Sequence, residues 1–429
     1  MSDMPLEIAT SEDIDQHIYS KKYWTFVNVA TGICVVRVCS NAVSLYNTAV
    51  LGSCGGIGQS VQYLSTGLFS LFLAKPTVDS LGCKNVFLVC GIMYVVYVLC
   101  FLGAVLCPKY MWEFNIPGSA LNGIAESLWL IGQGIYYSTS VTRILNLCPT
   151  LDDNTVRSQL AATHSTIYMG ADTSLLIIIT FAINFVGNVY SFSGILILCI
   201  VSTIYMLSFS DLDDGGRGHM NVHHLVEDVG QTFNLLRYDS RIKLVTPFLL
   251  AYGACNATVG TYITGVTIAT SPQLGEAYVG ILSALSRLAG TSCGPIYDFI
   301  SVRLGKGRHW VMLWGCAVYA ICGGLILTLS TATLGVPFVA VLYQILWGTG
   351  RGVMENTCRL IFAEFFAADV SSAFSFYAFA VSIWTGVSYF IDDVVSYDSM
   401  GTTVLLLSVC AAVCYHMAYS SRWEYSYIK

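Results

Sequence analysis

The stretch LWLIGQGIYYST at residues 128–139 returns in altered form as LWGTGRGVMENT at residues 346–357. Each copy reads Leu-Trp, two residues, Gly, one polar residue, Gly, four residues and Thr. Trp129 and Trp347 are 218 residues apart (347 − 129), which is about half of the 429-residue chain. A frame that recurs at half the chain length indicates an internal duplication.

A second pair of landmarks has nearly the same offset. KPTVD at residues 75–79 and GPIYD at residues 294–298 both read Pro-x-x-Asp, and their aspartates are 219 residues apart (298 − 79). A glycine and a basic residue follow each copy, namely Gly82 and Lys84, then Gly305 and Lys306. Two landmarks with nearly one offset predict two homologous halves.

The composition places this duplicated chain in a lipid bilayer. Hydrophobic residues make up 55% of the sequence and charged residues only 11%, whereas a soluble domain carries about 25% charged residues. The mean hydropathy is +0.65. We therefore expect an all-α, polytopic membrane protein with the lipid bilayer as its environment and without a nucleic-acid partner.

A span needs about 20 apolar residues, and twelve segments meet this need. The predicted spans are 24–46, 56–75, 85–107, 117–141, 160–187, 191–210, 243–268, 276–300, 309–330, 335–359, 370–392 and 402–420. They divide the chain into a tail (1–23), a six-helix bundle (24–210), a linker with an amphipathic helix (211–242), a second six-helix bundle (243–420) and a tail (421–429).

The basic residues predict the orientation. With the N-terminus inside, sixteen of the twenty Lys and Arg fall in inner segments, only Lys109 falls in an outer loop, and three lie within spans. The positive-inside rule therefore places both termini in the cytoplasm. Whether the membrane is the plasma membrane or an internal one is left open.

Six helices per copy is an even number, so both copies enter the membrane from the same side. Parallel six-helix repeats are the arrangement of the major facilitator superfamily. KPTVDSLGCK resembles that superfamily's signature between helices two and three, on Asp79, Gly82 and Lys84. The resemblance implies an inner gate at Asp79 and Lys84, and the repeat extends it to Asp298 and Lys306.

The first repeated stretch narrows the resemblance to the Unc-ninety-three-like family of that superfamily. That family has a Leu-Trp-x-x-Gln-Gly-x-Tyr type of run on helix four, and here Leu128, Trp129, Gln133, Gly134 and Tyr136 match it, with one extra residue before the Gln. The stretch QILWGTGRGVMENTCRLIFAEFF resembles the family's helix ten, and together the likeness covers about two thirds of the chain. The family implies either a solute carrier or a regulator of channels and receptors.

The repeated motif itself has two interpretations. In one, Gly132, Gly134, Gly350 and Gly352 allow close helix packing beside the two Trp residues. In the other, the residues between the glycines, Gln133 and Arg351, face each other across a central cavity. Both can hold if the glycines and the polar residue use opposite faces of the helix.

Six ionisable side chains lie deep within the predicted spans. Each would cost roughly 2.5–3.5 kcal/mol facing lipid at mid-membrane, so the set would cost more than a typical protein's whole stability of about 5–15 kcal/mol. They must therefore face the bundle interior, water or one another. These residues are Arg37, Glu126, Asp172, Arg287, Arg351 and Glu355.

Spacing and helix number suggest roles for these residues. Arg351 and Glu355 are four residues apart and can pair on one helix face, and His164, Tyr168 and Asp172 form one stripe. The charges either pair to hold the halves together, or bind a solute, with Arg37 or Arg351 gripping a carboxylate or phosphate. Glu126, Asp172 or His164 are alternatives for proton coupling.

Two functions follow. The first is a secondary transporter of a small and potentially anionic solute by alternating access, with Arg37, Glu126, Gln133, Asp172, Arg351 and Glu355 as the substrate or coupling residues. The second is a non-transporting regulator or chaperone of a channel or receptor, in which charges would face a partner's helix. No hydrolase, nucleotide or zinc motif is present in the sequence, so we expect no enzyme, no metal and no cofactor.

Overall fold

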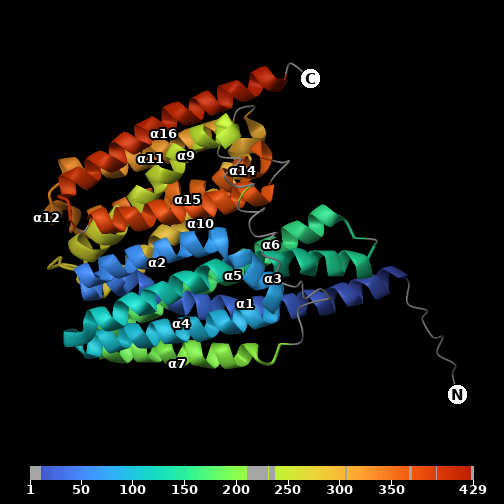
Figure 1. The fold of residues 1–429 in the computed structure, drawn as a ribbon, viewed down its shortest axis with the longest axis horizontal. Helices are drawn as coiled ribbons and strands as arrows, with labels where there is room; N and C mark the ends of the chain where they lie inside the picture. The colour runs from blue at the N-terminus through green and yellow to red at the C-terminus, as the bar shows by residue number, and fades with distance from the viewer. Residues whose placement is uncertain are drawn as a thin grey trace.

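The structure, a computed structural model, is a bundle of roughly aligned helices (Figure 1). It describes residues 11–149, 151–209, 230, 237–304, 307–366, 370–392 and 394–426. The first helix begins and the last helix ends at the same end of the bundle, which we call the termini end, and the opposite end is the far end (Figure 1). An even number of crossings requires this.

The first half of the chain packs as one set of helices. Its elements are α1 (Ser11–Leu51), α2 (Ser53–Phe72), α3 (Ala74–Leu81), α4 (Cys83–Leu106), the short η1 (Pro108–Tyr110), α5 (Met111–Leu147), α6 (Asp153–Val186) and α7 (Asn188–Met206).

The second half follows the same order. Its elements are α9 (Ser240–Thr258), the π-helical η2 (Val259–Ile268), α10 (Tyr278–Arg303), α11 (Gly307–Thr328), α12 (Thr331–Leu334), α13 (Pro337–Gly352), the π-helical η3 (Val353–Cys358), α14 (Arg359–Phe365), α15 (Val370–Asp392) and α16 (Tyr397–Ser426). Segments α9–η2 and α13–η3–α14 are continuous and each forms one crossing.

All twelve predicted spans are found as helices, in two sets of six. Their bounds differ from the prediction mainly at the termini end, where α1 begins at Ser11 and α16 continues to Ser426. A 30 Å hydrocarbon core needs only about 20 residues, so such long helices project beyond it. The amphipathic helix predicted in the linker falls almost wholly outside the described residues.

The contacts between the halves have the symmetry of a parallel repeat. The second helix of the first half, α2, packs against the fifth of the second half, α15. The second helix of the second half, α10, packs against the fifth of the first, α6. This reciprocal exchange is what an axis along the membrane normal produces.

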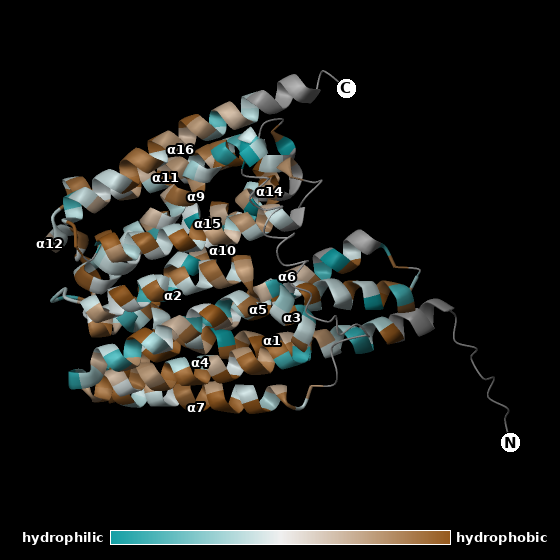
Figure 2. Cartoon of the chain, in the orientation of Figure 1, coloured by the Kyte–Doolittle hydropathy of each residue, from teal (hydrophilic) through white to brown (hydrophobic). Residues whose placement is uncertain are grey.

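Hydropathy follows the same symmetry. Within the described residues, eight helices are long and apolar enough to cross a membrane. The four crossings outside this set are α2, α5, α10 and α13, the second and fourth helices of each half. They are rich in Gly, whereas hydrophobic residues dominate α4 and α7 (Figure 2). These less apolar crossings are therefore suited to lining an interior cavity.

Glycines of the second motif bring α10 and α13 into backbone contact. A Cβ on Gly352 would lie 2.6 Å from the carbonyl oxygen of Gly290, and one on Gly348 would collide with the carbonyl of Ser286. Only hydrogen fits at these positions. This confirms close packing as one role of the motif.

The first motif uses its glycines differently. A Cβ on Gly132 would meet Val86 and Phe87 at 3.3 and 3.4 Å, which is tight packing against α4. Around Gly134, however, no atom of the described residues lies within 4 Å of the Cβ position. The prediction that Gly134 permits close packing is therefore wrong, because that face of α5 has no neighbour there.

Replacing Gly348 with Ala should destabilise the protein by about 1–3 kcal/mol, because the added methyl overpacks the contact between α10 and α13. Thermal unfolding of the purified protein in detergent measures this. Gly134→Ala is the matched control and should leave the unfolding temperature unchanged or slightly higher, since Ala favours helix over Gly. Equal losses in both variants would contradict the assigned packing.

Candidate functional site

A cavity of about 240 Å³ lies between the two halves. Its wall comes from α1, α2, α5 and α6 on one side, and from α9, η2, α10, α13 and α15 on the other. Four charged residues line it: Arg37, Glu126, Arg287 and Arg351. Most of the remaining lining is Asn, Gln, Ser, Thr and Tyr, so the cavity is polar as well as central.

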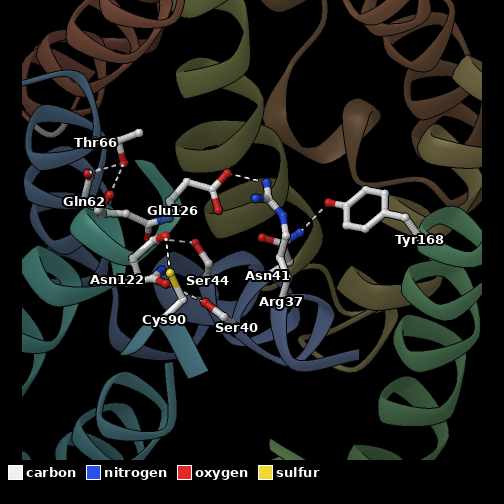
Figure 3. Close-up of polar contacts among 12 residues, drawn as sticks. Arg37, Ser40, Asn41, Ser44, Gln62, Thr66, Cys90, Asn122, Glu126 and Tyr168 are labelled. Atoms are coloured by element: carbon white, nitrogen blue, oxygen red, sulfur yellow. Dashed lines mark hydrogen bonds and ion pairs between the residues drawn. The ribbon is translucent and has the colours of Figure 1, made fainter. Parts of the chain in front are cut away.

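Arg37 of α1 and Glu126 of α5 form an ion pair within the first half (Figure 3). Arg37 is only 9% exposed, and its guanidinium lies 4.0 Å from the ring centroid of Trp129. The hydroxyl of Tyr94 donates to the second oxygen of Glu126 at 3.4 Å. Trp129, which belongs to the repeated motif, therefore makes a cation–π contact with the arginine of a buried ion pair.

Asp172 of α6 and Arg287 of α10 pair across the two halves. Their side chains are 3% and 13% exposed, respectively. Arg287 lines the cavity and Asp172 does not. Because α6 and α10 belong to different repeats, this ion pair joins the two halves, as one interpretation of the buried charges predicted.

Arg351 and Glu355 pair along one helix, with Nε 2.7 Å from Oε1. The spacing of four residues predicted this contact. Glu355 lies in η3, where the helix widens into a π-helix, a feature that is frequent at functional sites. Each of the six ionisable residues singled out in the spans thus has a partner of opposite charge.

The predicted stripe on α6 faces inward. The hydroxyl of Tyr168 lines the cavity and accepts a hydrogen bond from Asn41 Nδ2 at 2.7 Å (Figure 3). His164 lies nearer the termini end, with Nδ1 3.2 Å from Gln133 Nε2. Asp172 completes the stripe through its pair with Arg287.

Gln133 does not face Arg351 across the cavity, and that prediction is wrong. Arg351 belongs to the cavity lining, whereas Gln133 is absent from it and bonds to His164 instead. Gln133 shares a face with Glu126, seven residues earlier. The physical reason is that α6 packs against α5 and places His164 beside Gln133.

Sequence reasoning missed the polar residues of α2 and one of α13. Gln59, Gln62 and Tyr63 line the cavity, as does Gln344. Ser44 of α1 donates to the side-chain oxygen of Gln62 at 3.0 Å. The available signal was two Gln three residues apart in a Gly-rich span, which places them on one helix face.

The predicted inner-gate residues lie at the termini end as far as they are described. Asp79 is exposed on α3 and Lys84 is half-buried at the start of α4. Between them, Gly82 has φ +76°, a conformation that favours glycine, and turns the chain into α4. The side chain of Asp298 and the whole of Lys306 lie outside the described residues.

Several contacts close the two halves together at the far end. The hydroxyl of Tyr46 donates to the carbonyl of Ala277 at 3.2 Å and accepts from the N–H of Gly280 at 3.0 Å. Asn188 donates to Glu276 at 2.9 Å. These bonds join α1 and the start of α7 to the start of α10 and the loop before it.

The chain has no match among family models, and none among curated proteins. Solved structures do resemble it over nearly its full length. The nucleoside transporter NupG has a TM-score of 0.65 at 14% identity, covering 92% of this chain and 98% of that one. The peptide transporter POT, solved with sulfate, has a TM-score of 0.69 at 12% identity, covering 95% and 97%.

A D-xylose–proton symporter has a TM-score of 0.62 at 14% identity, covering 91% of this chain and 96% of that one. The chain has the fold of the major facilitator superfamily. At these identities the likeness shows the twelve-helix fold, and the eight long apolar helices of the described residues support a multi-pass membrane protein.

Replacing Asp172 with Asn should destabilise the protein by about 3–5 kcal/mol, because it leaves Arg287 buried without its counter-charge. The double variant Asp172→Asn/Arg287→Gln should recover most of that loss. A double-mutant cycle of thermal unfolding in detergent measures the coupling.

The pair of Asp239 and Arg241 serves as the control, since the Arg241 side chain is 41% exposed. Disrupting this pair should lower the free energy of unfolding by no more than about 1 kcal/mol. Additive effects at Asp172 and Arg287 would show that the two side chains do not interact.

Proposed function

We propose that this protein is a secondary transporter that moves a small polar solute by alternating access. The observation that carries the proposal is the polar cavity lined by both six-helix halves. A site shared between two rigid halves can be exposed to one side and then the other when the halves rock.

The size and lining of the cavity suit a small solute. Its volume of about 240 Å³ is below the roughly 300–1,000 Å³ of pockets for drug-sized ligands. Two aromatic pairs lie in its wall. Tyr63 stacks on Tyr389 at 5.7 Å between ring centroids, and Tyr252 stacks on Trp347 at 5.8 Å. Flat aromatic walls and buried amides are suited to positioning one compact polar molecule.

The contacts at the far end support a state that is closed on that side. The two bonds of Tyr46 join neutral groups and are each worth about 0.5–1.5 kcal/mol net, and the bond of Asn188 to the Glu276 carboxylate is worth about 1.5–3 kcal/mol. The free energy needed to break them is therefore small enough for the far end to open during a transport cycle. In this proposal the solute reaches the cavity from the termini end, which the positive-inside rule assigns to the cytoplasm.

The proposal includes finer assignments that come from the sequence. The chain is a member of the Unc-ninety-three-like family, both its termini are cytoplasmic, and Asp79, Lys84, Asp298 and Lys306 form the inner gate. The solved neighbours are transporters of nucleosides and peptides and a D-xylose–proton symporter, which supports transport as the class of activity.

The regulator hypothesis lacks a supporting observation. It requires some of the six buried charges to face outward toward a partner's helix. Instead each of the six is paired with another of the set. Four of them line the cavity, and the other two, Asp172 and Glu355, pair with residues that line it.

Counterflow of radiolabelled solutes into proteoliposomes tests the transport function. Wild-type protein should exchange at least one small polar solute, and Glu126→Ala and Arg351→Ala should reduce that exchange at least tenfold. The proposal fails if no solute moves and both variants leave every measured property unchanged.

Gly280→Trp tests alternating access separately. The side chain would enter the contact of Gly280 with Tyr46 and Thr180, so the far end could no longer close and exchange should be lost while the protein remains folded. Gly324→Trp is the control, since no described atom lies within 4 Å of its Cβ position. Full exchange in Gly280→Trp would contradict the role of far-end closure.

A further inference from the structure

The cavity wall also indicates what kind of solute it takes, an inference that rests on the proposed function. We infer that the solute is a small organic anion whose carboxylate binds Arg37, with Ser286 and Gln344 of the opposite half completing the site. The argument depends on which buried donors in the wall have no partner.

Arg37 is only partly satisfied by the protein. Its Nη2 pairs with Glu126, but Nε and Nη1 are buried and have no hydrogen-bond partner among the described residues. A buried donor without a partner costs more free energy when it belongs to a charged group than when it belongs to a neutral one. A ligand that supplies acceptors here removes that penalty, and a carboxylate makes the strongest such bond with a guanidinium.

Two residues of the opposite half that line the same cavity also carry unpaired donors. Ser286 Oγ on α10 and Gln344 Nε2 on α13 are buried and, within the described part of the chain, have no partner. Ser286 is 3% exposed and Gln344 is 1% exposed. Unpaired donors from both halves therefore converge on the cavity, which favours a solute rich in acceptors.

The charge of the lining points the same way. Three of its four charged residues are arginines, Arg37, Arg287 and Arg351, and the fourth is Glu126. The partners of Arg287 and Arg351, Asp172 and Glu355, are not part of the lining. A solute in the cavity thus meets more cations than carboxylates at close range, which disfavours a cationic solute and favours an anion.

Two neighbours determine where the Arg37 guanidinium lies and which of its nitrogens are free to bind a solute. Trp129 supports the guanidinium face at 4.0 Å, which holds the group in place. Glu126 occupies one nitrogen and so competes for the same cation as the solute's carboxylate. Neutralising Glu126 should therefore strengthen binding of an anion, whereas a merely structural ion pair would be weakened by the same change.

The test uses full-length protein in detergent, with binding measured by calorimetry. The probes are acetate, lactate and benzoate, each compared with its uncharged primary amide. At least one acid should bind more tightly than its amide. Glu126→Gln should tighten that binding, and Arg37→Gln/Glu126→Gln should weaken it about 10- to 100-fold relative to Glu126→Gln alone.

The double variant keeps the net charge of the pair, so it avoids leaving Glu126 buried alone, and its unfolding temperature confirms that it folds. Ser286→Ala and Gln344→Ala should each weaken acid binding about 2- to 10-fold. Arg241→Gln, which lies far from the cavity lining, should leave acid binding within twofold of wild type.

The inference is overturned if no acid binds to wild type or Glu126→Gln, if amides bind as well as their acids, or if Glu126→Gln weakens acid binding. Its failure differs from that of the proposed function. Counterflow of a neutral solute without acid binding would support the transport function and contradict the inference that the solute is an anion. Acid binding without exchange of any solute would support the anion site and contradict the transport function.

Discussion

Hydrocarbon cannot solvate an ionised side chain, and the interior of this protein is arranged around that constraint. Six ionisable residues lie within the crossings, and each meets a group of opposite charge: Arg37 with Glu126, Arg287 with Asp172, and Arg351 with Glu355. All six side chains are at most 28% exposed. Buried pairs rarely add net stability, so their position in and around one cavity suggests that function retains them.

The same constraint explains which helices carry polar residues. The second and fourth helices of each half are the less apolar crossings, and they pack closely enough at glycines to be covered by their neighbours. The contacts of Gly348 with Ser286 and of Gly352 with Gly290 are examples. Close backbone approach excludes lipid from one face of such helices and leaves the opposite face free to line the cavity.

Much of the fold was predictable from the sequence, because the signals for it are local or periodic. Apolar length gives the twelve crossings, and the offset between the two Leu-Trp motifs gives the repeat. The pair of Arg351 and Glu355 was predictable because a spacing of four residues fixes one helix face. By contrast, the partners of Arg37 and Asp172 lie 89 and 115 residues away (126 − 37 and 287 − 172), and pairing across helices depends on rotations that no local pattern reveals.

The errors have the same physical origin. Gln133 and Gly134 were placed by analogy with Arg351 and Gly352, yet the neighbours of α5 and α13 differ, so equal sequence positions meet unequal surroundings. Gln59 and Gln62 were not predicted, because an uncharged amide within a span costs less free energy than a charge and so gives a weaker signal of an interior position. The inner-gate prediction stays a prediction for all four residues, and the side chains of Asp298 and Lys306 lie outside the described residues.

The most direct test of the central claim is an electron cryo-microscopy structure of the full chain in lipid nanodiscs, at a resolution that shows side chains and acyl chains. The account predicts that Arg37, Arg287 and Arg351 point into a hydrated cavity between two six-helix halves, each beside its carboxylate, with no acyl chain in contact. Any of these three guanidinium groups lying against lipid density, or a bundle without a cavity between its halves, would contradict it.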